Sequence, residues 1–258
     1  MPFNVKSIKW KMNEYRDLRE IGVRRSILRD IMSGNYKRDS LKIYNSIGRK
    51  KALEMGIEFS DNTPGNLLKE VYFEKIYDIP GFIPSNGDKI IDVGASVGDT
   101  SIYWAKVYQA HVIAFEPLND VFLIMKQNVI LNDLEDLIEM HNEAVGNGKV
   151  IEGNIQKSMF GKSGNPDLSF RSRRLDEFNF NNISLLKIDV EGYEAEVIEG
   201  AIETIKSNHP KIILETHSKD LRKKCSDLLE SFGYVLNYHG KSRRGEGWMD
   251  EITNLFYL

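Results

Sequence analysis

Short apolar runs alternate along the chain with longer segments in which apolar residues recur at helical spacing. Five of these runs have the length and composition of buried strands, and they cover residues 90–93, 111–116, 138–144, 184–189 and 211–217. Helical spacing predicts four helices. One begins near residue 100, and the others cover residues 118–132, 193–207 and 220–232. Segments 233–239 and 252–258 predict a closing hairpin. The pattern is typical of an α/β protein built on a parallel sheet.

The first of these strands runs directly into a turn with two glycines, in the pattern Asp-x-Gly-x-x-x-Gly. Glycine tolerates positive φ and close approach of a ligand, and the start of the next helix offers unpaired N–H groups. The spacing differs from the Gly-x-Gly-x-x-Gly fingerprint of dinucleotide sites, which favours S-adenosylmethionine (SAM), a cofactor without a pyrophosphate. An ordinary turn of an α/β protein is the alternative. We predict cofactor contacts from Asp92, Gly94, Ala95, Ser96, Gly98 and Thr100.

A carboxylate at the end of the second strand completes the predicted cofactor site. Glu116 lies 24 residues beyond Asp92 and is followed by Pro117, which stops the strand. An acid at this distance can accept hydrogen bonds from both hydroxyls of a ribose. The alternative is a solvated residue at a strand end. A helix-like segment over residues 67–76 is expected to bring Tyr77 to the mouth of the same site.

Two further strands end in residues suited to acid–base chemistry. Asp189 lies where the strand 184–189 leaves the sheet, and Glu215 and His217 end the strand 211–217. Alternation puts Glu215 and His217 on one face of the sheet and Thr216 on the other. Ligands of open α/β sheets bind off these carboxyl ends. We therefore expect Asp189, Glu215 and His217 to converge.

These motifs together resemble the FkbM family of SAM-dependent methyltransferases. The similarity covers about residues 70 to 258 and includes IDVGASVGDTS at 91–101, FEP at 115–117, LDEF at 175–178, LLKIDVEGYEAEVIEGA at 185–201 and ILETH at 213–217. One departure is Ser96, where the family usually has Asn. The resemblance implies a Rossmann-like class I methyltransferase fold, with a seven-stranded, mostly parallel sheet, an antiparallel last strand and helices on both faces.

The resemblance also implies the reaction. SAM would be the methyl donor and S-adenosylhomocysteine the product, and the acceptor would be a hydroxyl, often of a sugar, glycan or related metabolite. In this fold the adenine lies near the end of the third strand, which suggests contacts from Asn142 and Ala144.

An alcohol acceptor must lose its proton during methyl transfer, and a base typically contributes about 10²–10⁴-fold to such a step. His217 is the best candidate base by residue type, while Asp189 could be the base or orient the acceptor. Asp189, Glu215 and His217 could also hold Mg²⁺ or Mn²⁺ as a Lewis acid, although we favour a metal-free pocket of hydrogen-bonded carboxylates. The polar loop 156–170 and the residues Arg243, Arg244 and Trp248 are further candidates for acceptor contacts.

Charge separates the chain into two parts. The first 60 residues hold 14 lysines and arginines against 7 acids, and the remainder holds 21 against 31. We predict a basic helical extension over residues 1–66, with an amphipathic helix at 13–33, and a methyltransferase domain over 67–258. A helical cap with a solvated basic face is the preferred role of the extension. A lid over an anionic substrate, an oligomer contact or docking on an acidic membrane surface are the alternatives.

Composition limits the remaining classes. The single cysteine, Cys225, excludes an intrachain disulfide, and no run of 18 apolar residues or signal-peptide core is present, so we expect a soluble cytoplasmic protein. Its oligomeric state is open. An RNA-modifying methyltransferase that uses the basic extension is the main alternative, although no Asn-Pro-Pro-Tyr-type run follows the fourth strand and no stacking platform accompanies the basic residues. An NAD-dependent oxidoreductase and a non-catalytic SAM-binding scaffold are less favoured.

Overall fold

The computed structural model describes residues 38–152, 169–241 and 253–258. The chain forms two compact units, Met1–Lys75 and Ile76–Leu258. The predicted helix at 13–33, most of the loop 156–170 and the residues Arg243, Arg244 and Trp248 lie outside the described residues. The expected domain boundary between residues 66 and 67 stays a prediction.

The described part of the first unit is helical. It consists of α3 (Arg38–Glu54), α4 (Gly65–Leu68) and the π-helical turn η1 (Lys69–Phe73), so residues 67–73 are helical as predicted. Arg49 of α3 donates hydrogen bonds to the carbonyl oxygens of Phe59, Ser60 (2.9 Å) and Thr63 (3.1 Å). Arg49 therefore holds the segment after α3 in place.

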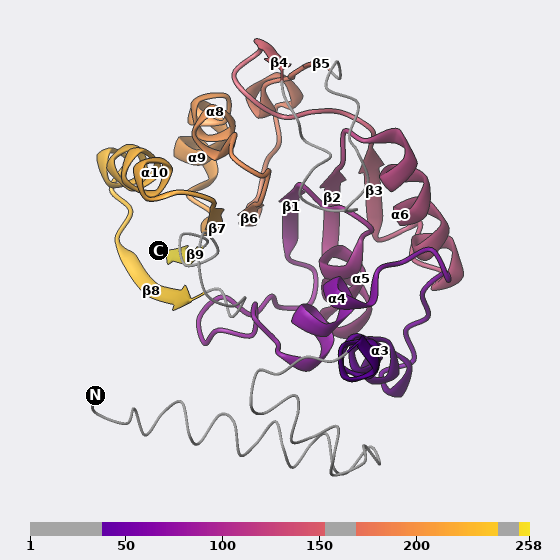
Figure 1. The fold of residues 1–258 in the computed structure, drawn as a ribbon. Helices are drawn as coiled ribbons and strands as arrows, with labels where there is room; N and C mark the ends of the chain where they lie inside the picture. Colours follow the sequence, from indigo (N-terminus) through magenta and orange to yellow (C-terminus); the bar gives the residue numbers. More distant parts are fainter. Residues whose placement is uncertain (1–37, 153–168, 242–252) are drawn as a thin grey trace, which may run out of the picture. The chain divides into compact units, whose positions relative to one another are not determined.

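In the described part of the second unit, seven strands form one sheet in the order β3-β2-β1-β6-β7-β9-β8 (Figure 1). The strands are β1 (Lys89–Val93), β2 (His111–Phe115), β3 (Ile138–His141), β6 (Ile183–Ile188), β7 (Lys211–Thr216), β8 (Leu236–Lys241) and β9 (Thr253–Tyr257). All neighbours are parallel except that β9 runs antiparallel to both β7 and β8. The predicted strands, the closing hairpin and the single antiparallel strand are confirmed.

The end of the third strand and the end of the loop 156–170 differ from the expectation. β3 ends at His141, so Asn142, Glu143 and Ala144 follow the strand and do not belong to it. The expected loop 156–170 ends inside a second, two-stranded sheet of β4 (Val150–Glu152) and β5 (Ser169–Arg171), which are antiparallel. Its last two residues are therefore part of a strand.

The helices of this unit are α5 (Asp99–Tyr108), α6 (Asn119–Leu131), the 3₁₀ turn η2 (Leu175–Phe178), α8 (Glu194–Glu199), α9 (Ile202–Asn208) and α10 (Lys219–Ser231). The prediction of one long helix over 193–207 is wrong, because this segment forms two helices, with Gly200 and Ala201 between them. Asp176 replaces the missing helical bond: its backbone N–H donates to the Gly200 carbonyl, and its side chain accepts from the backbone N–H (2.9 Å) and hydroxyl of Thr204. Gly200 also lies against Gly146, where a Cβ atom would be 1.8 Å from the Gly146 carbonyl oxygen.

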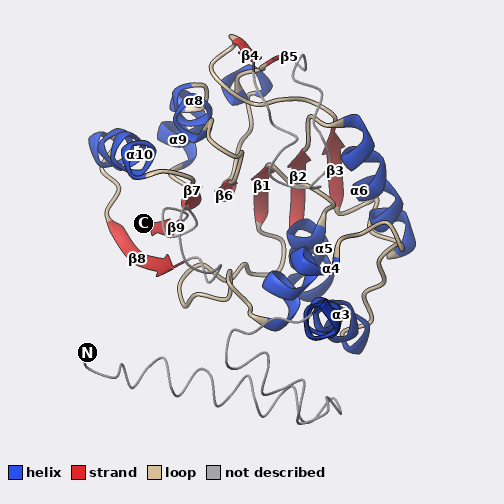
Figure 2. Ribbon diagram, viewed as in Figure 1, coloured by secondary structure: helices blue, strands red, loops and turns tan. Residues whose placement is uncertain are grey.

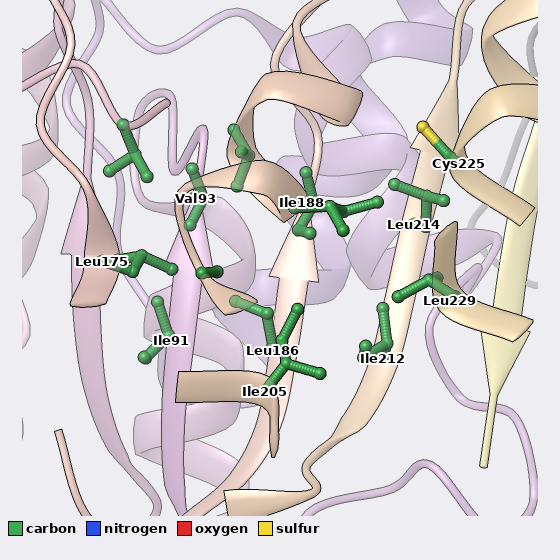
Figure 3. Packing of buried hydrophobic residues seen from close by; sticks show 14 of the residues in the cluster. Ile91, Val93, Leu175, Leu186, Ile188, Ile205, Ile212, Leu214, Cys225 and Leu229 are labelled. Atoms are coloured by element: carbon green, nitrogen blue, oxygen red, sulfur yellow. The ribbon is translucent and has the colours of Figure 1, made fainter. Parts of the chain in front are cut away.

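Alternate residues of the central strands face opposite sides of the sheet. On one side, apolar residues pack against α8, α9 and α10; Figure 3 shows Ile91, Val93, Leu186, Ile188, Ile212 and Leu214 in this layer. On the other side lie the intervening residues, including Asp92, whose carboxylate accepts a hydrogen bond from Ser101 of α5. Helices therefore cover both faces, with α8–α10 grouped apart from α5 and α6 (Figure 2). The layer that faces α5 carries the polar residues of the candidate site.

None of the helices in the described residues combines the length and the apolarity that crossing a lipid bilayer requires.

Candidate functional site

The glycine turn after β1 has an unusual backbone. Gly94, Ser96 and Gly98 have φ values of +82°, +52° and +80°. The N–H groups of Gly94 and Ala95 both donate to the carbonyl oxygen of Phe115, at 3.0 and 2.9 Å, which fixes the turn to the end of β2. A Cβ atom on Gly94 would lie 1.8 Å from the backbone oxygen of Asp189, so only glycine fits there.

Asp92 supports the turn from within the protein. Its side chain is fully buried, and its two oxygens accept hydrogen bonds from Lys187 Nζ (3.0 Å) and Ser101 Oγ (2.7 Å). Lys187 Nζ also donates to the Gly94 carbonyl oxygen (3.3 Å) and lies 3.7 Å from Asp189. Burial alone lowers the pKa of Lys187, but the Asp92 and Asp189 carboxylates outweigh it and raise the pKa well above its ordinary value. Lys187 is therefore charged, and direct contact between Asp92 and a ligand stays a prediction.

Glu116 and Ser96 form a polar pair at the ends of β1 and β2. The Glu116 carboxylate is buried and takes one backbone N–H on each oxygen, from Ser96 (3.1 Å) and Leu118 (2.8 Å). Burial raises the pKa of Glu116 to about 7, although these two N–H groups partly oppose the shift. Ser96 Oγ is buried without a hydrogen-bond partner in the described residues. Because an ionised carboxylate can accept about four hydrogen bonds, both oxygens of Glu116 keep capacity for ribose hydroxyls, and the pair fits SAM.

The other predicted cofactor residues lie around this pair. The Asn142 side-chain amide donates to the carbonyl oxygens of Glu116 (2.9 Å) and Pro117 (3.2 Å), so it fixes the strand end beside the carboxylate. Thr100 and Ala144 are buried, in the first turn of α5 and just beyond β3. Their contacts with a cofactor stay predictions.

Tyr77 is buried close to Lys187 and Trp104. Its ring packs against Trp104, with centroids 6.0 Å apart, and Lys187 Nζ lies 5.8 Å from its centroid. Burial, followed by the negative charges of Asp189 and Glu215, raises the pKa of Tyr77 well above its ordinary value. Tyr77 is therefore a neutral, buried phenol beside those carboxylates.

Four carboxylates surround His217, and we call these five residues the His217 cluster: Asp189, Glu191, Glu194, Glu215 and His217. The imidazole Nδ1 lies 2.7 Å from Glu194 Oε1, in a hydrogen bond. Its Nε2 faces Glu191 at 3.3 Å, Glu215 at 3.8 Å and Asp189 at 3.9 Å. The predicted convergence of Asp189, Glu215 and His217 is confirmed.

This environment changes the expected chemistry of His217. Burial alone would lower its pKa, but the hydrogen bond that it donates to Glu194 and the charges of Asp189, Glu194 and Glu191 raise the pKa to about 10. The imidazole of the ligand-free protein therefore carries its proton at neutral pH and cannot accept another. The other candidate base, Asp189, has a side chain that is 25% exposed, and its catalytic role stays a prediction.

Four residues of the site were not predicted from the sequence: Lys187, Ser101, Glu191 and Glu194. A lysine inside the apolar strand Leu185–Ile188 was a usable signal, because a buried charge needs a partner. Ser101 and Glu194 gave no comparable signal, since their partners Asp92 and His217 are remote in the sequence.

Comparisons with known proteins agree with this geometry. The family model described as Methyltransferase FkbM domain matches residues 92–238. Methyltransferase sdnD of Sordaria araneosa is 27% identical over 215 residues, which cover 65% of this chain and 81% of that protein. Methyltransferase 1 of Beauveria bassiana is 22% identical over 223 residues, which cover 74% of this chain and 86% of that protein.

A solved structure shares the fold. Methyltransferase FkbM from Methylobacillus flagellatus KT superposes with a TM-score of 0.54 at 18% identity. The superposition covers 90% of this chain and 60% of that one, so the chain spans less than two thirds of this relative. The family match includes the glycine turn, Glu116 and the whole His217 cluster, and it extends over more than half of the sequence. The chain therefore belongs to the FkbM methyltransferase family and is a SAM-dependent methyltransferase.

Proposed function

We propose that this protein transfers a methyl group from SAM to a hydroxyl oxygen of a sugar, glycan or related small metabolite. The observation that carries the proposal is the position of Asp189. Its backbone oxygen packs against Gly94 of the cofactor turn, and its carboxylate belongs to the His217 cluster. A donor bound at the turn and a hydroxyl held by Asp189 would therefore be neighbours.

Residues of the first two strand ends would hold the cofactor. Glu116 would accept hydrogen bonds from the ribose hydroxyls, and Ser96 Oγ, buried without a partner in the described residues, would complete that contact. SAM supplies a methyl group already activated by its sulfonium. The protein must then align the acceptor oxygen with that methyl group, and such positioning can reach effective molarities of about 10⁵–10⁸ M.

The acceptor side supports an oxygen nucleophile. Asp189 lies between two cations, with Lys187 Nζ 3.7 Å from Oδ2 and His217 Nε2 3.9 Å from Oδ1. Its carboxylate can accept a hydrogen bond from a hydroxyl and take the proton as the new bond forms, which typically contributes about 10²–10⁴-fold. Lys187 and the protonated His217 keep this carboxylate in place.

The cofactor assignment is tested by titration calorimetry with SAM, S-adenosylhomocysteine and NADH. We expect micromolar binding of the first two, strong weakening in Glu116→Ala and no binding of NADH. A preference for NADH, or no binding of SAM by the folded protein, would contradict the assignment.

The acceptor class is tested with methyl-labelled SAM and a panel of hydroxylated sugars, glycosides and RNA. Asp189→Asn should lower the turnover number by about 10²–10⁴-fold while SAM still binds. Glu203→Gln removes an exposed carboxylate outside the site and is the matched control. Labelling of RNA but of no hydroxylated metabolite would overturn the proposal.

A further inference from the structure

We propose that Asp189, Glu215 and His217 bind one divalent metal ion, with Mn²⁺ the best match to the donor set. This inference deepens the proposed function and rests on it, because the ion would lie where the acceptor hydroxyl is held. The sequence left a metal site open as the less favoured alternative, and the geometry of the His217 cluster now favours it.

The donor atoms have the spacing of ligands around one ion. One donor from each of the three residues lies within 4.8 Å of the others. Ligand bonds of about 2.1 Å place adjacent ligands about 3 Å apart and opposite ligands about 4.2 Å apart. His217 Nε2 lies 3.8 Å from Glu215 and 3.9 Å from Asp189, between these two values. Both separations are longer than a direct hydrogen bond, which would be near 2.9 Å, and they leave room for an ion between the donors.

The imidazole is oriented as a metal ligand. Its Nδ1 is bound to Glu194, and its Nε2 therefore faces the carboxylates. Metal-binding histidines usually donate their other ring N–H to a carboxylate or carbonyl in this way, which fixes the tautomer. The interaction crosses from α8 to the end of β7, so both helix and strand define the ring's direction.

Glu194, which is not one of the three proposed ligands, adds a second observation. Its side chain is fully buried, and its second oxygen, Oε2, has no hydrogen-bond partner in the described residues. Its other oxygen, Oε1, accepts hydrogen bonds from the Gly192 N–H (3.0 Å) and from His217 Nδ1. A buried carboxylate is costly unless positive charge lies nearby. The protonated imidazole supplies this charge in the ligand-free protein, and a divalent ion that displaced the Nε2 proton would supply it in the metal-bound protein.

The donor chemistry selects the type of ion. Carboxylates suit Mg²⁺, Ca²⁺ and Mn²⁺, whereas imidazole suits transition metals, and Mn²⁺ accepts both. An ion there would supply a Lewis acid that lowers the pKa of an acceptor hydroxyl, and Asp189 would then act as a ligand and not as the proton acceptor.

The test is a titration of the purified, metal-stripped full chain with Mn²⁺ alone. Binding is measured as the loss of the electron paramagnetic resonance signal of free Mn²⁺. We expect one ion per chain, and at least about tenfold weaker binding in Glu215→Gln and His217→Ala. Glu194→Gln should weaken binding by about 10–100-fold, because it removes the partner that orients His217. Glu203→Gln, outside the cluster, should bind as the wild type does.

Two results would overturn the inference: no Mn²⁺ binding by folded wild-type protein, or equal binding by the wild type and the cluster variants. Circular dichroism verifies that each variant is folded, and the wild-type titration is decisive without any variant. SAM titration in the same preparation separates the two proposals. Binding of SAM without Mn²⁺ would remove only the metal site, whereas binding of Mn²⁺ without methylation of any hydroxylated acceptor would remove only the proposed acceptor class.

Discussion

Lys187 and Asp92 form a buried ion pair across the centre of the sheet, with 3.0 Å between Nζ and Oδ1. The two residues are direct neighbours in the pairing of β1 with β6, so the register of the strands brings them together. Their exposed side-chain fractions are 4% and 0%. The pair joins the strand that leads into the cofactor turn to the strand that ends at Asp189.

We predict that Lys187→Met lowers the free energy of unfolding by about 3–5 kcal/mol, because it leaves the Asp92 carboxylate buried without its counter-ion. The double variant Lys187→Met/Asp92→Asn should lose less than the single variant, since no uncompensated charge is then left in the sheet. Urea denaturation of the wild type, both single variants and the double variant measures this coupling. Additive losses in the double variant would contradict the predicted coupling.

Gly94→Ala should abolish SAM binding and destabilise the fold. The new methyl group would meet the backbone oxygen of Asp189 at 1.8 Å, at a φ of +82° that alanine rarely adopts. Gly98→Ala is the matched comparison, because its φ is similar, +80°, but its new methyl group would meet the flexible side chain of Met125 at 2.9 Å. Calorimetric titration should give weakened binding for Gly98→Ala and none for Gly94→Ala. Equal SAM affinities in the two variants would show that close packing of Gly94 against Asp189 is not required for SAM binding.

SAM affinity should rise with pH across neutrality. Burial raises the pKa of Glu116 to about 7, and the ribose hydroxyls donate to the ionised carboxylate. The carboxylate is therefore mostly protonated at about pH 6 and mostly ionised at about pH 8, which predicts about tenfold tighter binding at the higher pH. Titrations over this range measure the effect, and Glu116→Gln should bind weakly with a flat profile. A wild-type affinity that does not change with pH would contradict the role of Glu116.

The raised pKa of Glu116 also makes the stability of the fold depend on pH. The folded protein keeps the Glu116 proton at pH values where the unfolded chain has released it, because the folded pKa is the higher one. The contribution of Glu116 to stability therefore falls as the pH rises from the ordinary carboxyl pKa to about 7. Glu116→Gln should remove this part of the pH dependence in urea denaturation.

Gly200→Ala should cost about 1–3 kcal/mol of unfolding free energy, since its methyl group would meet the backbone of Gly146 at 1.8 Å. The expectation is opposite to that for a glycine inside a regular helix, where alanine stabilises. Ser207→Ala, on the exposed side of α9, should change stability by less than about 0.5 kcal/mol. A stabilised Gly200→Ala variant would mean that α8 and α9 can merge into one helix.

Local patterns predicted the second unit well. Buried strands such as Ile183–Ile188 are mostly apolar, and the acids that follow them identify the carboxyl edge of the sheet. Residues Glu116 and Asp189 could therefore be assigned from strand ends alone. Alternation likewise predicted that Glu215 and His217 share one face of the sheet.

Features that depend on tertiary contacts could not be predicted in this way. The break between α8 and α9 depends on Asp176, which lies 28 residues before its partner Thr204. The protonation of His217 depends on Glu194 of α8, and the sequence by itself suggested a neutral imidazole. Both cases involve a polar partner brought in from another element.

The close packing of Gly94 against Asp189 has a consequence for how this enzyme can diversify. The Asp189 N–H also donates to the Val93 carbonyl (3.0 Å), so main-chain atoms of two adjacent strands fix the position of Asp189 relative to the glycine turn. In the proposed function, these contacts would set the separation between the methyl donor and its acceptor. Close-packed main-chain contacts of this kind change little when surface segments are replaced. Changes in the surrounding loops would therefore allow new acceptors to bind without changing the distance between the methyl donor and the acceptor.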